Sequence, residues 1–249
     1  MALNKAKIIT VTSVKGGTGK TTTVLNIAGI LTKMQKKTIV IDLDLYGGSI
    51  SASLNLKTDN DIYTLNEDMM NNRFKNIKDY TKNYNEYIEI LAAPIDPRSV
   101  SKISSTFIDT LLSRLSTQYD VILIDTNHIS DKTNLIAFDH SDTILYVITN
   151  DLMDVKNMKT MISIYKDMKV SNYKIILNLA KLANTSYTPY DLKNVLEANI
   201  DYIIPKKFYN HNIEKYIYNG QIMTLDQGIL NSKGGQIIKT IVEDVLKEE

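Results

Sequence analysis

The sequence predicts an α/β fold, a doubly wound and mostly parallel sheet of about seven strands with helices on both faces. Apolar runs of strand length recur along the 249 residues, and most of them lack the polar alternation of a half-exposed strand. Strands that are covered on both faces have this composition. Segments with helical periodicity separate the runs, and such alternation is typical of parallel sheets. The runs cover residues 7–13, 38–42, 87–91, 120–125, 142–149, 173–178 and 200–204.

Helical periodicity is clearest after the first run, where four apolar residues share one face. They are Val24, Ile27, Ala28 and Leu31. Another helix is expected to begin at Thr188-Pro189, because threonine caps a helix and proline fits its first turn. Residues 55–86 have weak periodicity and are expected to form a helical excursion. No linker rich in Pro, Gly or Ser divides the chain, so residues 1–249 are expected to form a single domain.

Composition limits the classes of function. With 29 basic and 28 acidic residues, the chain offers no overall attraction to nucleic acid or to an anionic membrane. Its lack of cysteine excludes disulfides and thiolate metal sites, and its three histidines lack metal-ligand spacing. Neither a signal peptide nor a long apolar span is present, which predicts a cytoplasmic protein.

A glycine-rich stretch joins the first apolar run to the first helical segment. It consists of Lys15, Gly16, Gly17, Thr18, Gly19, Lys20, Thr21 and Thr22. Three glycines let consecutive backbone N–H groups turn inward around an anion, and the N-terminus of the following helix favours negative charge. Lys20 is expected to reach the β and γ phosphates of a nucleotide, and the Thr21 hydroxyl to hold Mg²⁺. The alternative is a glycine-rich turn with two solvated lysines.

The stretch departs from the strict P-loop pattern, because Val14 stands where the first glycine belongs and Lys15 opens the loop. The pattern K-G-G-x-G-K-[ST]-[ST] resembles the deviant Walker A loop of the ParA/MinD superfamily of ATPases. This resemblance implies that Lys15 reaches across the interface of an ATP-dependent homodimer to the partner's nucleotide. It also implies ATP and Mg²⁺ as cofactors.

Two later runs end in carboxylates. The resemblance implies that Asp44, in the string Asp42-Leu43-Asp44, orients the attacking water, and that Asp42 supports it or the Mg²⁺ shell from behind. Asp125 looks like the Walker B carboxylate that holds Mg²⁺ through a water. A proline-rich switch often follows in this superfamily, but Asn127 and His128 stand here, and their part in a switch stays open. The alternative is that Asp42 and Asp44 are surface residues that merely end the strand.

The sequence indicates the residues that would contact the nucleotide base less clearly. Asn178 ends a strand at a place where the superfamily often contacts adenine, and Pro205 resembles its later adenine-flanking segment. The guanine signature N-K-x-D is missing after Asn178, which favours ATP over GTP. An asparagine that merely turns the chain after its strand is the alternative. The motifs contain no glutamine or arginine finger, so we expect slow intrinsic hydrolysis that accelerates on dimerisation.

Three strings resemble the CpaE/TadZ pilus-assembly branch: D-L-D-L-x-x-G-S from Asp42, L-A-A-P-x-x-P from Leu91, and the helix end before Gly220. They imply a positioning cycle for a pilus or secretion machine, with recruitment to the cell pole or the inner membrane face left open. CpaE/TadZ proteins usually carry a receiver-like domain before the ATPase, and here the first strand is expected near residue 7.

Two alternatives remain. ParA-like partition would use non-specific DNA binding by exposed lysines, and a scaffold would hold ATP with negligible hydrolysis. The C-terminal segment has an apolar stripe, but acidic residues on its polar side argue against MinD-like membrane binding. We expect this helix to pack on the sheet.

Overall fold

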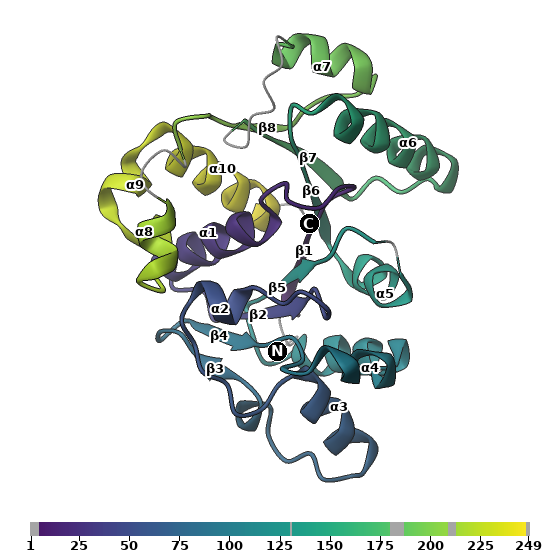
Figure 1. Cartoon of the computed structure of the whole chain (residues 1–249), viewed down its shortest axis with the longest axis vertical. Coiled ribbons are helices and arrows are strands. Elements are labelled where there is room, and N and C mark those ends of the chain that lie inside the picture. The colour runs from purple at the N-terminus through teal and green to yellow at the C-terminus, as the bar shows by residue number, and fades with distance from the viewer. Residues whose placement is uncertain (1–4, 130, 180–186, 209–212, 248–249) are drawn as a thin grey trace.

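A parallel sheet runs through the middle of the molecule (Figure 1). The fold is known from a computed structural model, which describes residues 5–129, 131–179, 187–208 and 213–247. Within these residues the sheet has eight strands in the order β3-β4-β2-β5-β1-β6-β7-β8. The strands are β1 Lys7–Thr12, β2 Thr38–Leu43, β3 Lys82–Asn83, β4 Ile88–Leu91, β5 Val121–Thr126, β6 Thr143–Ile148, β7 Tyr173–Asn178 and β8 Tyr202–Ile204.

Every pairing in this sheet is parallel except that of β3 with β4, which confirms the predicted class. All seven predicted runs contain a strand. The extra strand, β3, has two residues, both exposed, and is too short for an apolar pattern to reveal it. Because β1 lies between β5 and β6, the loops that follow these three strands lie side by side at the carboxyl edge of the sheet.

Helices cover both faces of the sheet (Figure 1). The longer ones are α1 Lys20–Lys33, α3 Ile62–Met70, α4 Ser105–Leu115, α5 Lys132–His140, α6 Leu152–Met168, α7 Pro189–Leu196 and α10 Lys233–Lys247. The shorter ones are α2 Ile50–Ser53, α8 Ile213–Tyr218, α9 Gln227–Asn231 and the 3₁₀ helices η1 Ile77–Asp79, η2 Pro97–Lys102 and η3 Met223–Leu225. As predicted, Thr188 caps α7, and Asp191 completes the capping box.

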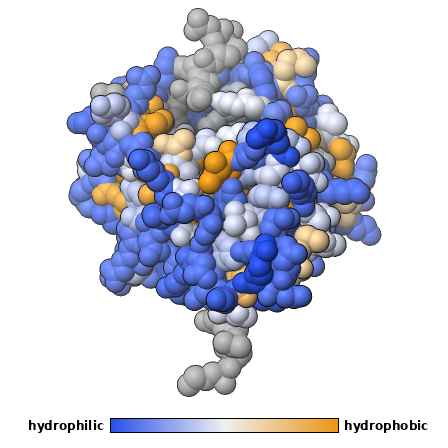
Figure 2. Space-filling model, turned by 60° about the horizontal axis from the view of Figure 1, so that its bottom comes forward, coloured by the Kyte–Doolittle hydropathy of each residue, from blue (hydrophilic) through white to orange (hydrophobic). Residues whose placement is uncertain are grey.

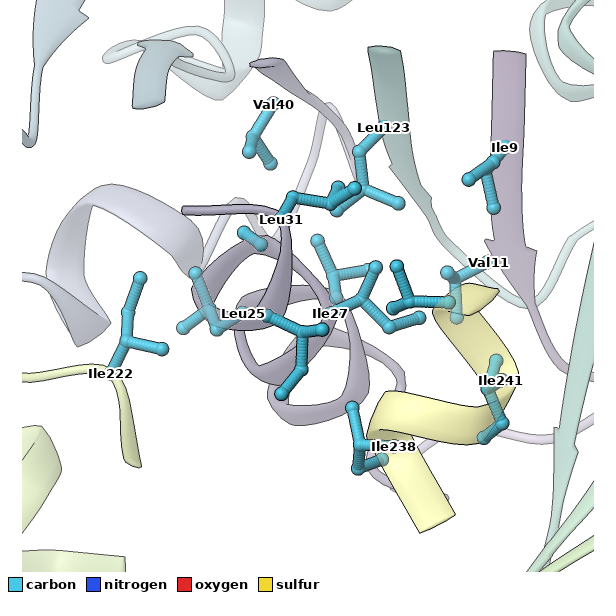
Figure 3. Packing of buried hydrophobic residues seen from close by; sticks show 14 of the residues in the cluster. Ile9, Val11, Leu25, Ile27, Leu31, Val40, Leu123, Ile222, Ile238 and Ile241 are labelled. Atoms are coloured by element: carbon cyan, nitrogen blue, oxygen red, sulfur yellow. The ribbon is translucent and has the colours of Figure 1, made fainter. Parts of the chain in front are cut away.

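One face of the sheet is covered by α1 and α10 (Figure 3). The predicted stripe of α1 is fully buried there, with Ile27 and Leu31 packed among residues of β1, β2 and β5. The apolar stripe of α10, which includes Ile238 and Ile241, is buried in the same cluster. This confirms that the last helix packs in the core. Among the described residues, no helix is both long and apolar enough to cross a bilayer.

The segment after β8 is tied directly to α1. Thr224 of η3 donates through its Oγ1 to the carbonyl of Asn26 at 2.7 Å and through its backbone N–H to Asn26 Oδ1 at 3.2 Å. All of these atoms are buried. Asn26 Nδ2 in turn donates to the carbonyl of Thr22 in the first turn of α1. The C-terminal quarter of the chain therefore holds the helix that follows the glycine-rich stretch.

The opposite face carries two further clusters. Helices α3, α4 and α5 pack over β2 and β5, and α6 and α7 pack over β6 and β7. The predicted excursion at residues 55–86 contains α3 and η1, together with the unexpected β3. On the face in Figure 2, hydrophilic side chains predominate and the hydrophobic ones form small, separate patches.

Candidate phosphate-binding site

The phosphate loop, residues 15–20, connects β1 to α1. Gly17 and Gly19 have φ angles of 77° and 98°, a left-handed conformation that residues with a Cβ rarely adopt. Gly19 has a second requirement, because a Cβ there would lie 2.6 Å from Nδ2 of Asn178. That Nδ2 donates to the carbonyl of Thr18 at 2.8 Å, so the end of β7 supports the turn. The loop therefore has a fixed shape, and its first three residues are exposed.

Lys20 is the buried cation of this loop, with 8% of its surface exposed. Its Nζ donates to Ser13 Oγ at 3.1 Å, and Ser13 Oγ donates to the carbonyl of Lys15 at 2.6 Å. Burial lowers the pKa of Lys20, while the charges of Asp125 and Asp44 oppose this shift. A buried ammonium group is costly unless an anion compensates it. The environment of Lys20 therefore suits a bound phosphate.

A hydroxyl and a buried carboxylate lie together at the start of α1. Thr21 Oγ1 donates to Asp125 Oδ2 at 2.6 Å and lies 3.0 Å from Ser49 Oγ. Burial raises the pKa of Asp125 to about 7. Among the described residues, none donates to the other oxygen, Asp125 Oδ1, although it is buried. A carboxylate oxygen without a partner beside a threonine hydroxyl fits a magnesium ion and its bound water.

Magnesium at this place would need oxygen ligands beyond these two side chains. In the described part of the chain, no group of three or more His, Asp or Glu side chains could hold a metal ion. Magnesium commonly keeps several waters and binds through substrate phosphates. The residues therefore fit a metal that arrives with a nucleotide better than one held by the protein alone.

Asp42 and Asp44 have different surroundings. Asp42 is buried in β2, opposite Asp125 of β5, and accepts hydrogen bonds from the backbone N–H groups of Asp44 at 3.2 Å and Ile50 at 3.1 Å. Burial and then the charge of Asp125 raise its pKa well above the usual value. Asp42 thus holds the loop that follows β2. Asp44 is half-buried, and its charge acts on Lys20.

The loop between β2 and α2 depends on Gly48. A Cβ at this position would lie 2.3 Å from the Cβ of Ala93 and 3.2 Å from Asp42 Oδ2. Such a close approach admits only glycine, and it brings the next residue, Ser49, to Thr21. Sequence reasoning did not identify Ser49 as a site residue, although it closes the D-L-D-L-x-x-G-S string.

The loop after β5 is shaped by two buried asparagines. Asn127 Oδ1 accepts from the backbone N–H of Ile129 and from Asn134 Nδ2, both at 2.8 Å. Asn134 Nδ2 also donates to the carbonyl of Ile129 at 2.5 Å. His128, which directly follows Asn127, is exposed. Asn134 was not predicted, because it lies in the first turn of α5 and outside every recognisable motif.

The loop after β6 is shaped by two aspartates. Asp151 caps α6, accepting from the N–H groups of Met153 and Asp154, and its Oδ1 lies 3.2 Å from Lys15 Nζ. The hydrogen bonds from Asp154 N–H and Lys15 lower the pKa of Asp151. Asp154 is buried and accepts from both the N–H and the hydroxyl of Thr149. Burial raises its pKa.

The structure gathers most of the predicted residues around the loop. Lys15, Lys20, Thr21, Asp42, Asp44 and Asp125 are linked through the contacts above. Asn178 reaches the phosphate loop, and its contact with adenine stays a prediction. Pro205 directly follows β8, which pairs with β7, and its contact with adenine also stays a prediction.

A glycine-rich turn of this kind, at the carboxyl edge of a parallel sheet, defines the P-loop class of phosphate-binding proteins. The chain belongs to the AAA-domain family, because that family's sequence model matches residues 6–179. It is 23% identical over 202 residues to an uncharacterised ATP-binding protein of Methanocaldococcus jannaschii, covering 80% of this chain and 74% of that protein. It is 29% identical over 146 residues to the chromosome partitioning protein ParA of Myxococcus xanthus, covering 56% of this chain and 50% of ParA.

Solved structures share the fold. A ParA family ATPase from Chlorobium tepidum superposes with a TM-score of 0.80 at 18% identity, covering 97% of this chain and 99% of that one. The septum site-determining protein MinD of Pyrococcus horikoshii, complexed with Mg-ADP, superposes with a TM-score of 0.79 at 23% identity, covering 97% and 96%. The chain therefore shares its fold with ParA and MinD ATPases of known structure.

Proposed function

We propose that the protein is a Mg²⁺-dependent ATPase whose two copies associate face to face around two ATP molecules. One observation carries the proposal: a buried lysine lies in a glycine turn next to a Thr21–Asp125 pair whose second carboxylate oxygen has no partner among the described residues. This arrangement supplies a cation, a glycine turn and an oxygen ligand for a triphosphate and its metal. The MinD structure from Pyrococcus horikoshii holds Mg-ADP on the same fold.

Each group has a part in this reaction. Thr21 and, through water, Asp125 would hold magnesium, which neutralises charge on the transferring phosphate, and Asp42 would lie behind them. Lys20 binds the phosphate oxygens as a point charge. Asp44, half-buried near Lys20, accepts a proton from the attacking water and orients it. Hydrolysis then depends on positioning, which is consistent with a slow rate.

Lys15 is suited to reach another copy. Its side chain is 46% exposed, and its Nζ lies 3.2 Å from Asp151 Oδ1, at the start of the phosphate loop. Exposed ion pairs of this kind contribute about 0–1 kcal/mol, so the pair costs little to exchange. A phosphate of the partner's nucleotide carries more charge than one carboxylate and is the stronger acceptor.

The test measures phosphate release against protein concentration. A rate per molecule that rises with concentration is expected, because the pocket is completed by a second copy. Lys20→Ala should lose both ATP binding and the dimer. Lys15→Ala should keep much of the binding but lose the ATP-dependent dimer in light scattering, and Asp44→Ala should bind and dimerise but not hydrolyse.

An exposed lysine away from the pocket supplies the control, and Lys36→Ala should behave as the parent does. A fast rate that does not change with concentration would contradict the dimer. Equal rates in Asp44→Ala and the parent would leave an ATP-binding scaffold as the better description.

For the cargo, we favour a pilus or secretion machine. The proposal rests on the D-L-D-L-x-x-G-S string, which resembles the CpaE/TadZ branch. Two residues of this string have structural roles at the site: Gly48 allows a close approach, and Ser49 contacts Thr21. A fluorescent fusion in the native cell that forms a polar focus or lines the inner membrane face is the expected result. A signal spread over the nucleoid would favour the partition alternative.

One observation supports that alternative. Lys33, Lys36 and Lys37 at the end of α1, and Lys206 and Lys207 after β8, are exposed. Non-specific DNA binding by such lysines falls steeply with salt. A gel-shift series with ATP at rising salt tests it, with Lys206→Glu/Lys207→Glu as the variant; no shift at low salt rejects it.

A further inference from the structure

The loop after β5 carries a histidine that the proposed reaction leaves unused. A Cβ placed on Gly16 would lie 3.6 Å from both Cε1 and Nδ1 of His128. The imidazole ring therefore lies beside the first glycine of the phosphate loop, although the two residues are far apart in the sequence. Because β5 pairs directly with β1, the sheet itself brings the two loops together.

The backbone that carries His128 is held in place. The hydrogen bonds of Asn127 and Asn134 close the turn on both sides of it, and these two asparagines are 6% and 1% exposed. Asn134 Nδ2 is shared between Asn127 Oδ1 and the Ile129 carbonyl, and these buried hydrogen bonds oppose rearrangement of the turn. His128 is thus an exposed side chain on a rigid support, which is the arrangement that a ligand contact requires.

The strand order indicates which part of a nucleotide His128 meets. The residues predicted to lie at adenine, Asn178 and Pro205, follow β7 and β8 on one side of β1. His128 follows β5 on the other side, three residues after the carboxylate that bonds Thr21. Thr21 and Asp125 would hold the metal that accompanies the phosphates, so this side of β1 is expected to receive the phosphate end of a nucleotide. His128 therefore faces the phosphate end of the pocket.

We propose that His128 donates a hydrogen bond to the terminal phosphate of bound ATP, so that the loop after β5 distinguishes ATP from ADP. The inference rests on the proposed function and adds a specificity-determining residue to the same site. Imidazole has an N–H donor in either neutral tautomer and two when charged, so it can serve a phosphate oxygen throughout the neutral range. ADP lacks that oxygen, and the donor then faces water.

The test compares affinities for a non-hydrolysable ATP analogue and for ADP, each with Mg²⁺, by calorimetry on the full chain. His128→Ala should bind the ATP analogue about 10-fold more weakly, the usual cost of a hydrogen bond to a charged group, and ADP within about 2-fold of the parent. His128→Gln retains an N–H donor and should recover part of the loss.

His140 supplies the matched control, because it lies at the end of α5 and its Nε2 is bonded to Asp109 at 2.7 Å, away from the phosphate loop. His140→Ala should leave both affinities unchanged. Equal weakening of the two nucleotides in His128→Ala, or no change in either, overturns the proposal while the parent's ATP binding still supports the ATPase. A parent that binds neither nucleotide overturns both.

Discussion

The phosphate loop and the two loops beside it are built in opposite ways. Between β1 and α1 the chain relies on glycines, two of them with left-handed φ angles, so the backbone itself forms the pocket. After β5 and β6 the chain relies on buried side chains, the Asn127–Asn134 pair and the Thr149–Asp154 pair, to fix turns that carry exposed residues. The first loop offers backbone N–H groups, and the other two offer side chains.

This difference assigns general phosphate binding to the backbone of the phosphate loop and selective contacts to the side chains of the two flanking loops. A backbone cradle accepts any phosphate of suitable shape, because every peptide group has the same N–H. Side chains on fixed turns, His128 beside Gly16 and Asp151 beside Lys15, add contacts that depend on which nucleotide or partner is present. Substitutions of the glycines in the phosphate loop should therefore disrupt all nucleotide binding, whereas substitutions in the flanking loops should change its selectivity or its pH dependence.

The largest effect is expected for Gly19→Ala. It places a Cβ at a φ of 98° and 2.6 Å from Asn178 Nδ2, so both the strain and the clash have to be relieved. We expect a loss of about 3 kcal/mol in the free energy of unfolding, measured by urea denaturation, and no nucleotide binding.

The matched variant is Gly17→Ala. Its φ angle is also left-handed, but nothing lies within 4 Å of the added Cβ. The free energy of unfolding should fall by about 1 kcal/mol, because only the backbone strain remains. Equal losses in the two variants would show that the contact with Asn178 does not matter.

The next effect is expected for Asn134→Ala. It removes the donor to Asn127 Oδ1 and to the Ile129 carbonyl, both in a buried turn. The loss of stability should be about 1–3 kcal/mol, because buried acceptors are left without a partner. The same variant should weaken the ATP analogue more than ADP, since His128 loses its support. If Asn134→Ala kept the stability and the nucleotide selectivity of the parent, Asn134 would not be the residue that holds this loop in place.

A smaller effect that depends on pH is expected for Asp154→Asn. Burial raises the pKa of Asp154, so the folded protein holds this proton at pH values where the unfolded chain has lost it. The free energy of unfolding of the parent therefore falls as pH rises from the unfolded pKa through the folded one. The asparagine variant lacks this decline. It should be more stable at pH 7.5 by on the order of 1 kcal/mol and equal near pH 4, in denaturation followed at several pH values.

The smallest effect on stability is expected for Asp151→Asn. The pKa of Asp151 is lowered, so its contribution is present above the unfolded pKa and is lost as pH falls, opposite in sign to that of Asp154. Because the Lys15 pair is exposed, the change should stay within about 0.5 kcal/mol. Light scattering should nevertheless show the ATP-dependent dimer at lower protein concentration, since Lys15 is released. A large loss of stability would mean that the pair is structural.

The two kinds of loop also differ in how far sequence could predict them. Glycines at fixed spacing after a strand indicate the shape of the backbone directly. Lys20, Thr21 and the succession of strand, loop and helix around them could therefore be predicted. The carboxylates of Asp42 and Asp125 were predicted at strand ends, where parallel strands share an edge. Asn134 and Asp154 have no such signal, because each acts through a partner that only the folded loop brings near. The two-residue strand β3 is set by its neighbour β4 rather than by its own composition.

The tie between Thr224 and Asn26 bears on how this protein can be dissected. A fragment that stops at residue 179, where the family match ends, would lack η3 and α10 and would expose apolar residues of the core cluster that these elements share with α1. Such a fragment would keep every residue of the phosphate loop yet lose the scaffold that orients it. Truncation studies on this chain should therefore preserve its last helix, even though the phosphate loop itself lies near the N-terminus.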